Sequence, residues 1–363
     1  MPGKRILILD GFRFIAITAV LFYHLTSPYV AHYPHTDFLF HVFKFGYLGV
    51  YFFFMISGFV INYTLENTSN LVYFLRNRFA RLFPAMLLCS LITFLVAGAL
   101  TKPQDITGAH QVRNFLPSLT FTNPALWTLF TGKTFHWING SYWSLWVELQ
   151  FYILAAVIYY AGKQHFLRNF IVAAVLISVF KDFPNLAGAA HPGIMYWWRT
   201  STEIFNLTFN ICWFCFGIYF YQLFKGLPFG IRHLRSYGWL AIALCLALDL
   251  HNFYENSGDM LICCILMCLL FLLMIYRKSA LAGLENRVVT YIGKISYSIY
   301  LVHEVAGLLL INSYSRYLGP FAFLSPFLVI LMVIVFAAVS FKFYESKIVE
   351  WLRGRVRSPA MNK

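Results

Sequence analysis

Residues 9–24, LDGFRFIAITAVLFYH, form an apolar stretch that carries two polar side chains, Arg13 and His24. An α-helix turns about 100° and rises about 1.5 Å per residue, so this spacing puts both side chains on one face, about 16 Å apart. An Arg deep in a bilayer costs roughly 2.5–3.5 kcal/mol unless a partner compensates its charge. We therefore predict that this stretch is a membrane-spanning helix that lines a polar channel in a helix bundle.

The composition of the whole chain excludes a soluble protein. The chain has 363 residues, of which 60% are hydrophobic and 12% charged, whereas soluble domains are about 45–50% apolar and about 25% charged. The formal net charge is +14, but most basic residues lie in short clusters between apolar runs, as on the cytoplasmic side of membrane proteins. We predict a multi-pass protein whose partners include membrane lipids and no nucleic acid.

Apolar runs separated by Pro, Gly, Asn or charge clusters predict an all-α integral membrane fold, with about ten transmembrane helices in a single bundle. The predicted spans are 6–26, 45–63, 82–100, 143–161, 167–181, 204–224, 237–253, 259–276, 293–313 and 321–344. Placing both termini in the cytoplasm puts most of the 28 basic residues on that side, as the positive-inside rule requires. Residues 1–345 then form the transmembrane domain and 346–363 a short basic cytoplasmic tail.

Three further features of the sequence concern the fold and the processing of the chain. The stretch 115–131 holds two prolines and several Ser and Thr residues, which favours a re-entrant or surface piece. All seven cysteines lie within apolar runs, where Cys usually behaves as a small hydrophobe, so we expect neither disulfides nor a metal site. The first helix is interpreted as retained, because Arg13 interrupts the apolar region that a signal peptide needs.

Two further spans carry polar side chains on one face. In the fourth span the side chains recur at steps of three to four residues, and the ninth span, ISYSIYLVHE, repeats the pattern. The first set is Ser141, Ser144, Glu148 and Tyr152, and the second is Ser296, Tyr300 and His303. Ionisable groups inside a span are functional by default. Arg13, His24 and Glu148 are therefore the catalytic candidates.

Other polar residues leave more than one interpretation open. In FLRNRFARLFP, expected as the second cytoplasmic loop, Arg76, Arg78 and Arg81 either clamp phosphates or only anchor the chain on the cytoplasmic side. Asp10 caps the first helix, pairs with Arg13 or takes part in catalysis. His303 lines the site or is a core histidine. Tyr142 belongs to an interfacial aromatic belt with Trp143 and Trp146, or supports the site.

Five motifs stand in one order along the chain: LDGFRFIAITAVLFYH with its R-x10-H spacing, GYLGVYFFFMISGFVI, RNRFARLFP, SYWSLWVELQFY and ISYSIYLVHE. Together they resemble the membrane-bound acyltransferase-3 family, bacterial inner-membrane proteins that O-acylate surface carbohydrates. The resemblance maps the family's Arg–His pair onto Arg13 and His24, its R-x-R onto Arg76 and Arg78, and its helix-four acid onto Glu148. The family usually has Glu-x-Pro where this chain has Glu345-Ser346-Lys347, so the exit of the last helix is in doubt.

The resemblance implies a stand-alone multi-pass enzyme of the bacterial inner membrane, without a fused esterase-like domain. It would move an acyl group, most often acetyl, from cytoplasmic acyl-CoA to a hydroxyl of a surface or lipid-linked glycan. Acetyl-CoA or another acyl-CoA is the co-substrate, and no permanently bound cofactor or metal is expected. Arg13, Arg76 and Arg78 would bind the donor.

In the predicted mechanism His24 is the general base on the sugar hydroxyl, with a transient acyl-His as a variant. Glu148 would orient the imidazole. Tyr300 or His303 would support the oxyanion, and Asp10, Tyr142 and Ser144 complete the supporting residues.

Two other functions are compatible with many helices and intramembrane charges. A transporter or flippase of a lipid-linked sugar would move its substrate without consuming acyl-CoA. A non-catalytic partner in polysaccharide assembly would tolerate the loss of His24. The identity of the acceptor, the length of the acyl group and the oligomeric state are left open by the sequence.

Overall fold

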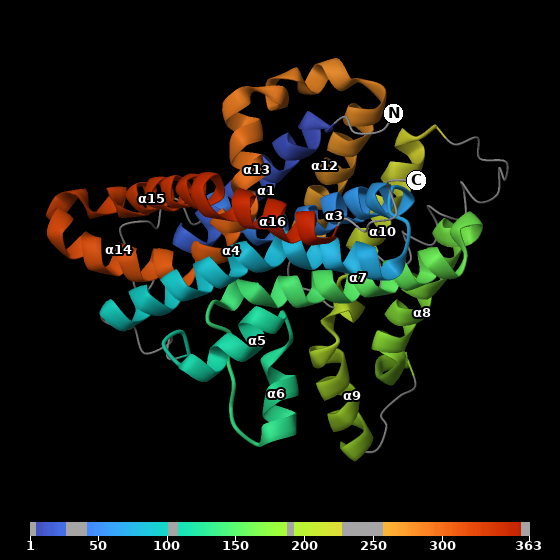
Figure 1. Ribbon diagram of the computed structural model, residues 1–363, viewed down its shortest axis with the longest axis horizontal. Coiled ribbons are helices and arrows are strands. Elements are labelled where there is room, and N and C mark those ends of the chain that lie inside the picture. Colours follow the sequence, from blue (N-terminus) through green and yellow to red (C-terminus); the bar gives the residue numbers. More distant parts are fainter. Residues whose placement is uncertain (1–4, 27–41, 101–107, 187–191, 227–256, 357–363) are drawn as a thin grey trace. The chain divides into compact units, whose positions relative to one another are not determined.

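The computed structural model describes residues 5–26, 42–100, 108–186, 192–226 and 257–356, and all regular structure in these ranges is helical (Figure 1). The prediction of an all-α fold is thereby confirmed. The predicted span 237–253 lies outside the described residues. The chain divides into two compact units. The first comprises 1–50, 75–146 and 284–363, and the second comprises 51–74 and 147–283.

The first unit contains α1, most of α4, and the helices at the end of the chain. Its main helices are α1 (Leu7–Thr26), α4 (Leu71–Ala99), α13 (Arg287–Val302), α14 (Val305–Leu318), α15 (Ser325–Ser340) and α16 (Ser346–Val356). Short helices α5 (Phe115–Thr120) and α6 (Pro124–Thr131) form the stretch that was predicted as a re-entrant or surface piece. Short turns η2 (Gly46–Leu48), η3 (Val112–Asn114), η4 (Gly140–Tyr142), η8 (Gly319–Leu324) and η9 (Phe341–Glu345) connect these helices.

The second unit is built around α10 (Ile211–Phe224), which is buried along most of its length. Its other helices are most of α3 (Gly49–Glu66) and α7 (Trp143–Ala161), together with α8 (Phe166–Leu186), α9 (Pro192–Ile204) and α12 (Ser257–Tyr276). Short turns are η5 (Lys163–His165), η6 (Asn206–Phe209) and most of η7 (Lys278–Glu285). Stacked rings such as Phe151 on Phe214, with centroids 4.0 Å apart, fill the core.

Six stretches of the described chain are long and apolar enough to cross a membrane. They are Leu7–Thr26, Gly46–Glu66, Leu71–Ala99, Gly140–Ala161, Lys163–Lys181 and Val305–Leu352. A seventh candidate, Leu261–Tyr276 followed by Lys278–Glu285, is bent by 103°. In the longest stretch α14 and α15 lie side by side (Figure 1). The chain is thus a multi-pass candidate, while ten spans and cytoplasmic termini stay predictions.

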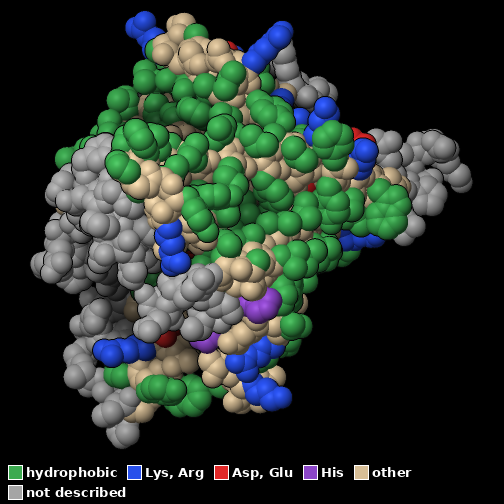
Figure 2. Space-filling model, turned by 90° about the vertical axis from the view of Figure 1, so that its left-hand side faces the viewer, with side chains coloured by type: hydrophobic (Ala, Val, Ile, Leu, Met, Phe, Trp, Pro, Cys, Tyr) green, Lys and Arg blue, Asp and Glu red, His purple; other side chains and the backbone are tan. Residues whose placement is uncertain are grey.

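The outward face of α15 shows why these helices suit a bilayer. Leu331, Val335 and Val339 recur along one side of the helix and are exposed, whereas Val333 and Ala337 on the other side are buried. Hydrophobic side chains cover much of the face shown in Figure 2. Exposed apolar surface of this kind is stable in contact with lipid rather than water.

The segment that was expected as the second cytoplasmic loop is helical. The side chain of Asn70 accepts a hydrogen bond from the N–H of Tyr73 at 2.9 Å and so caps α4. From Leu71 the helix continues through the arginines, which are good helix formers. Pro84 lies inside α4 without ending it. The prediction of a helix that begins only at residue 82 was therefore wrong.

Two other predicted spans are interrupted. The predicted span 293–313 divides into α13 and α14, because the helix breaks at His303 and Glu304. The predicted span 204–224 contains the short turn η6 before α10 begins at Ile211. A helix break leaves backbone groups that need other partners, and at this break residues 139 and 141 form hydrogen bonds to Leu301 and Glu304.

Near the end of the chain, α15 passes through the π-helical turn η9 into α16 without a stop. Ser346 and Lys347 stand where the family usually has x-Pro, and a Pro there would remove a backbone donor. The carboxylate of Glu345 is buried and accepts hydrogen bonds from the hydroxyls of Ser298, at 2.7 and 2.8 Å, and of Ser340. The exit of the last helix, in doubt from the sequence, is thus a continuous helix.

In the first unit, α1 lies very close to α13 and to Leu284 near the end of η7. A Cβ atom on Gly293 would lie 1.8 Å from the backbone oxygen of Asp10, and one on Gly11 would lie 2.6 Å from the Cβ of Leu284. Such distances are far below van der Waals contact, so both positions require glycine. Ile8 and Phe12 of α1 are fully buried in the same unit.

Gly293→Ala is expected to destabilise the protein by about 1–3 kcal/mol or more, because the added methyl meets backbone rather than a movable side chain. Thermal unfolding of the detergent-solubilised protein measures the effect. Gly283→Ala, at a position where a Cβ meets nothing within 4 Å, is the control. Equal melting temperatures for the two variants would contradict the close packing.

Candidate active site

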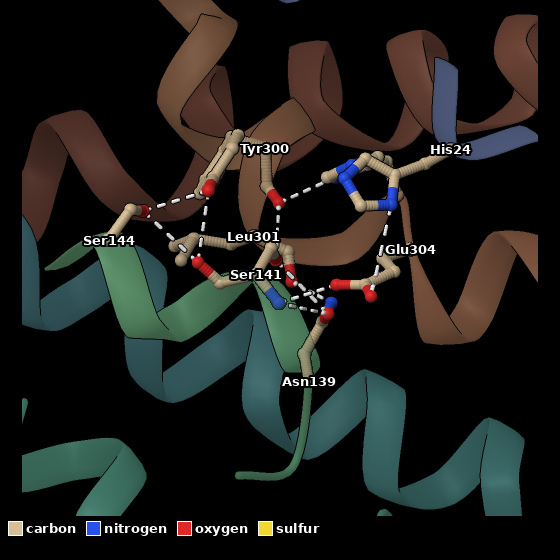
Figure 3. A network of polar contacts seen from close by, with 8 residues as sticks. His24, Asn139, Ser141, Ser144, Tyr300, Leu301 and Glu304 are labelled. Atoms are coloured by element: carbon tan, nitrogen blue, oxygen red, sulfur yellow. Dashed lines mark hydrogen bonds and ion pairs between the residues drawn. The ribbon is translucent and has the colours of Figure 1, made fainter. Parts of the chain in front are cut away.

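His24 lies near the end of α1, and its Nδ1 is 3.8 Å from Oε1 of Glu304 (Figure 3). The two side chains are 18% and 14% exposed, so both are shielded but reachable. The ring of His303 stands nearly perpendicular to that of His24, with centroids 5.0 Å apart. Sequence reasoning missed Glu304, although an acid within an apolar run was the same signal that singled out Glu148.

The carboxylate of Glu304 is held from the side opposite His24. The backbone N–H of Ser141 donates a hydrogen bond to Oε2 of Glu304. A Cβ on Gly140 would lie 2.8 Å from Oε1 and 3.1 Å from Oε2, so the carboxylate occupies the space that a side chain at residue 140 would need. One oxygen therefore faces the turn η4 and the other faces the imidazole.

Asn139 fastens this turn to the end of α13 (Figure 3). Its side-chain N–H donates to the carbonyl of Leu301 at 2.9 Å, and its Oδ1 accepts from the hydroxyl of Ser141 at 3.0 Å. Leu301 contributes one of the last four carbonyls of α13, which have no N–H partner within the helix. Because Asn139 is completely buried, its bonds replace those that water would supply elsewhere.

The predicted supporting residues Ser144 and Tyr300 contact each other. Their hydroxyl oxygens are 2.8 Å apart, and the Tyr300 hydroxyl also donates to the carbonyl of Ser141 at 3.0 Å. Tyr142 is fully buried and its hydroxyl accepts from that of Ser90 at 3.3 Å. The interpretation of Tyr142 as part of an exposed interfacial belt was therefore wrong.

His303 is completely buried, and its Nδ1 is 2.7 Å from the carbonyl oxygen of Tyr300. A carbonyl can only accept, so Nδ1 carries the hydrogen in this contact. Nε2 has no hydrogen-bond partner among the described residues. His303 is thus a core residue that also packs against His24, and its role in lining the site stays a prediction.

The other end of α1 carries a cluster of charges. Asp10 is almost fully buried and pairs with Arg13, at 2.8 Å between Oδ1 and Nη1, which confirms the predicted contact three residues apart. Oδ2 of Asp10 pairs with Nε of Arg5 at 2.6 Å. Arg81 of α4 repels Arg13 electrostatically. The cluster therefore has more positive than negative charge.

The two residues of the R-x-R motif leave α4 on different faces. Arg76 is exposed and Arg78 is buried, because residues two apart on a helix point about 200° away from each other. Arg78 and Arg81, three apart, lie on neighbouring positions of one face.

Glu148 belongs to the second unit. Oε1 of its carboxylate accepts hydrogen bonds from the hydroxyl of Ser57, at 2.7 Å, and from the hydroxyl of Tyr152 one turn further along α7. The expected proximity of Glu148 and Tyr152 on one face is confirmed. The role predicted for Glu148 beside His24 stays a prediction.

A family model described as "Acyltransferase domain" matches residues 6–344, nearly the whole chain. The chain belongs to the acyltransferase-3 family. A Staphylococcus aureus (strain MSSA476) protein, provisionally named an O-acetyltransferase, is 26% identical over 95% of this chain and 57% of its own length. The acyltransferase MdmB of Streptomyces mycarofaciens is 29% identical over 53% of this chain and 52% of its own length.

An O-acetyl transferase of Shigella phage Sf6 is 30% identical over 31% of this chain and 34% of its own length. The chain spans about half the length of the curated relatives that it matches. No solved structure matches the chain.

Asn139→Ala is expected to cost about 1–3 kcal/mol, because it leaves the buried Leu301 carbonyl without its donor. It should also lower activity by loosening the turn that holds Glu304. The melting temperature of detergent-solubilised Asn139→Ala would be compared with that of Asn67→Ala. This control removes an exposed side-chain hydrogen bond to the carbonyl of Tyr63. A melting temperature no lower than that of this control would rule out the anchoring role.

Proposed function

We propose that this chain is an O-acyltransferase of the bacterial inner membrane. It takes an acyl group, most often acetyl, from cytoplasmic acyl-CoA and delivers it to a hydroxyl of a surface or lipid-linked glycan. The family and the names of the relatives support acyl transfer to a hydroxyl. The observation that carries the proposal is His24, placed on an apolar helix with its Nδ1 turned toward a carboxylate.

His24 acts as the general base through Nε2. It removes the proton of the acceptor hydroxyl while the oxygen attacks the thioester carbonyl. The carbon–sulfur bond then breaks, and the proton passes from the imidazolium to the CoA thiolate. The products are an ester and free CoA, and the imidazole returns to its neutral form. In an alternative mechanism the acyl group passes first from CoA to His24 and then from His24 to the acceptor hydroxyl.

The oxyanion requires a donor that is free to point at it. Tyr300 and His303 were predicted for this role, but both donate to backbone carbonyls, those of Ser141 and Tyr300. Either side chain would have to break its hydrogen bond to that backbone carbonyl before it could donate to the oxyanion. Rearrangement of this kind fits the break between α13 and α14, which both residues adjoin.

The donor binds at the charged end of α1. Arg13, backed by Arg5 and Arg81, offers excess positive charge to the phosphates of CoA. Arg76 and Arg78 of α4 add positive charge to the donor site, Arg76 from an exposed position and Arg78 from a buried one. The helix rise places Arg13 about 16 Å from His24, a distance that the uncharged pantetheine arm has to span so that the thioester meets the imidazole.

His24→Ala should abolish transfer of label from acetyl-CoA to an acceptor glycan while the protein still accumulates in the membrane. General-base catalysis contributes about 10²–10⁴-fold, so residual activity should be at least a hundredfold lower. Purified protein, labelled acetyl-CoA and mass spectrometry of surface glycans provide the readout. His165→Ala, on an exposed turn, is the control. Full activity of His24→Ala would refute the mechanism, and glycan movement without acyl-CoA consumption would favour a transporter.

Arg13→Ala should raise the KM for acetyl-CoA by about 10- to 100-fold, because hydrogen bonds to charged groups contribute about 1.5–3 kcal/mol. Added salt should weaken donor binding by the wild-type protein more than by the variant. Arg168→Ala removes an exposed arginine of α8 and serves as the matched control. A donor KM that is equal in both variants would exclude Arg13 from the donor site.

A further inference from the structure

We infer that Glu304 is the positioning residue for His24. Its carboxylate accepts the Nδ1–H of the imidazole, selects that tautomer, and so leaves Nε2 unprotonated to act on the acceptor hydroxyl. The inference rests on the proposed function, in which His24 is the general base. It assigns to Glu304 the role that was predicted for Glu148.

The geometry of the pair supports this assignment. Nδ1 of His24 and Oε1 of Glu304 are 3.8 Å apart, which is within ion-pair range but about 0.9 Å longer than a typical N–H···O bond. Contacts between a catalytic base and its partner are often long before substrate binds and tighten afterwards. A shift of about 0.9 Å would form the bond, and both side chains are mostly shielded from competing solvent.

Glu304 is prevented from turning away. The Ser141 N–H holds Oε2, and the absence of a side chain at Gly140 provides the space for the carboxylate. With Oε2 engaged by the backbone, Oε1 is the oxygen left to face the imidazole. An acid fixed by a backbone donor on one side and free on the other can orient a histidine as in catalytic triads.

The break between α13 and α14 gives Glu304 this direction. In an uninterrupted helix His303 and Glu304 would point about 100° apart. Instead α13 ends at Val302, and Glu304 is the residue that precedes α14. The oxygen of Glu148, in contrast, already accepts from two hydroxyls.

The decisive comparison is between Glu304→Gln and Glu304→Asp. Gln keeps the size and an acceptor for Ser141 but removes the charge, whereas Asp keeps the charge on a shorter side chain. We expect Glu304→Gln to lower kcat about 10- to 100-fold with little change in the KM for acetyl-CoA, and Glu304→Asp to recover part of the loss. A merely structural role would change both parameters or neither.

Gly140→Ala provides an independent test, because it moves the carboxylate without removing it. The added Cβ would lie 2.8 Å from Oε1, at the end of a flexible side chain, so the backbone need not shift. Gly140→Ala should lower kcat in the wild-type background and have little further effect in Glu304→Gln, since both act through one interaction. Glu345→Gln is the control background, because the Glu345 carboxylate is bonded to Ser298 and Ser340. In that background Gly140→Ala should keep its full effect on kcat.

A wild-type kcat for Glu304→Gln, or additive effects of Gly140→Ala and Glu304→Gln, would overturn the inference. The amount of each variant in the membrane and its melting temperature separate loss of function from loss of fold. If Glu304→Gln fails to accumulate, the effect of Gly140→Ala on kcat tests the inference instead. His24→Ala is assayed in parallel. If it is active the proposed function fails, whereas an inactive His24→Ala beside a fully active Glu304→Gln overturns only the role of Glu304.

Discussion

The candidate site depends on how one backbone carbonyl is satisfied. Within a bilayer every backbone polar group needs a partner in the protein, and the last carbonyls of a helix have none within it. The side chain of Asn139 supplies that partner for Leu301. Because this bond closes the end of α13, the chain can leave the helix at His303 and start a new one at Val305.

This constraint joins three segments that lie far apart in the sequence. Residues 139–144 stand next to the end of α13, and α1 brings His24 to the same place (Figure 3). The contacts between them are mostly hydrogen bonds with the backbone, such as Ser141 N–H to Glu304 and Tyr300 hydroxyl to Ser141. Bonds to backbone atoms position side chains well, because the backbone itself is fixed by the helices.

Local spacing predicted part of this arrangement. The pairing of Asp10 with Arg13 and the shared face of Glu148 and Tyr152 follow from steps of three and four on a helix, and the structure contains both. Glu304 could not be predicted in the same way. Its orientation comes from a break that a distant asparagine stabilises, and no Gly or Pro marks the break in the sequence. The helical arginines of α4 were missed because their charge was taken as a sign of a loop.

The close contact of Gly293 with Asp10 has a mechanical consequence. Where two backbones touch with no side chain between them, one helix cannot slide along the other or tilt away without first separating. The helix that carries both Arg13 and His24 is thus held tightly against α13. In the proposed mechanism, the distance that the acyl donor has to span between the two side chains would therefore be set by the length of one helix.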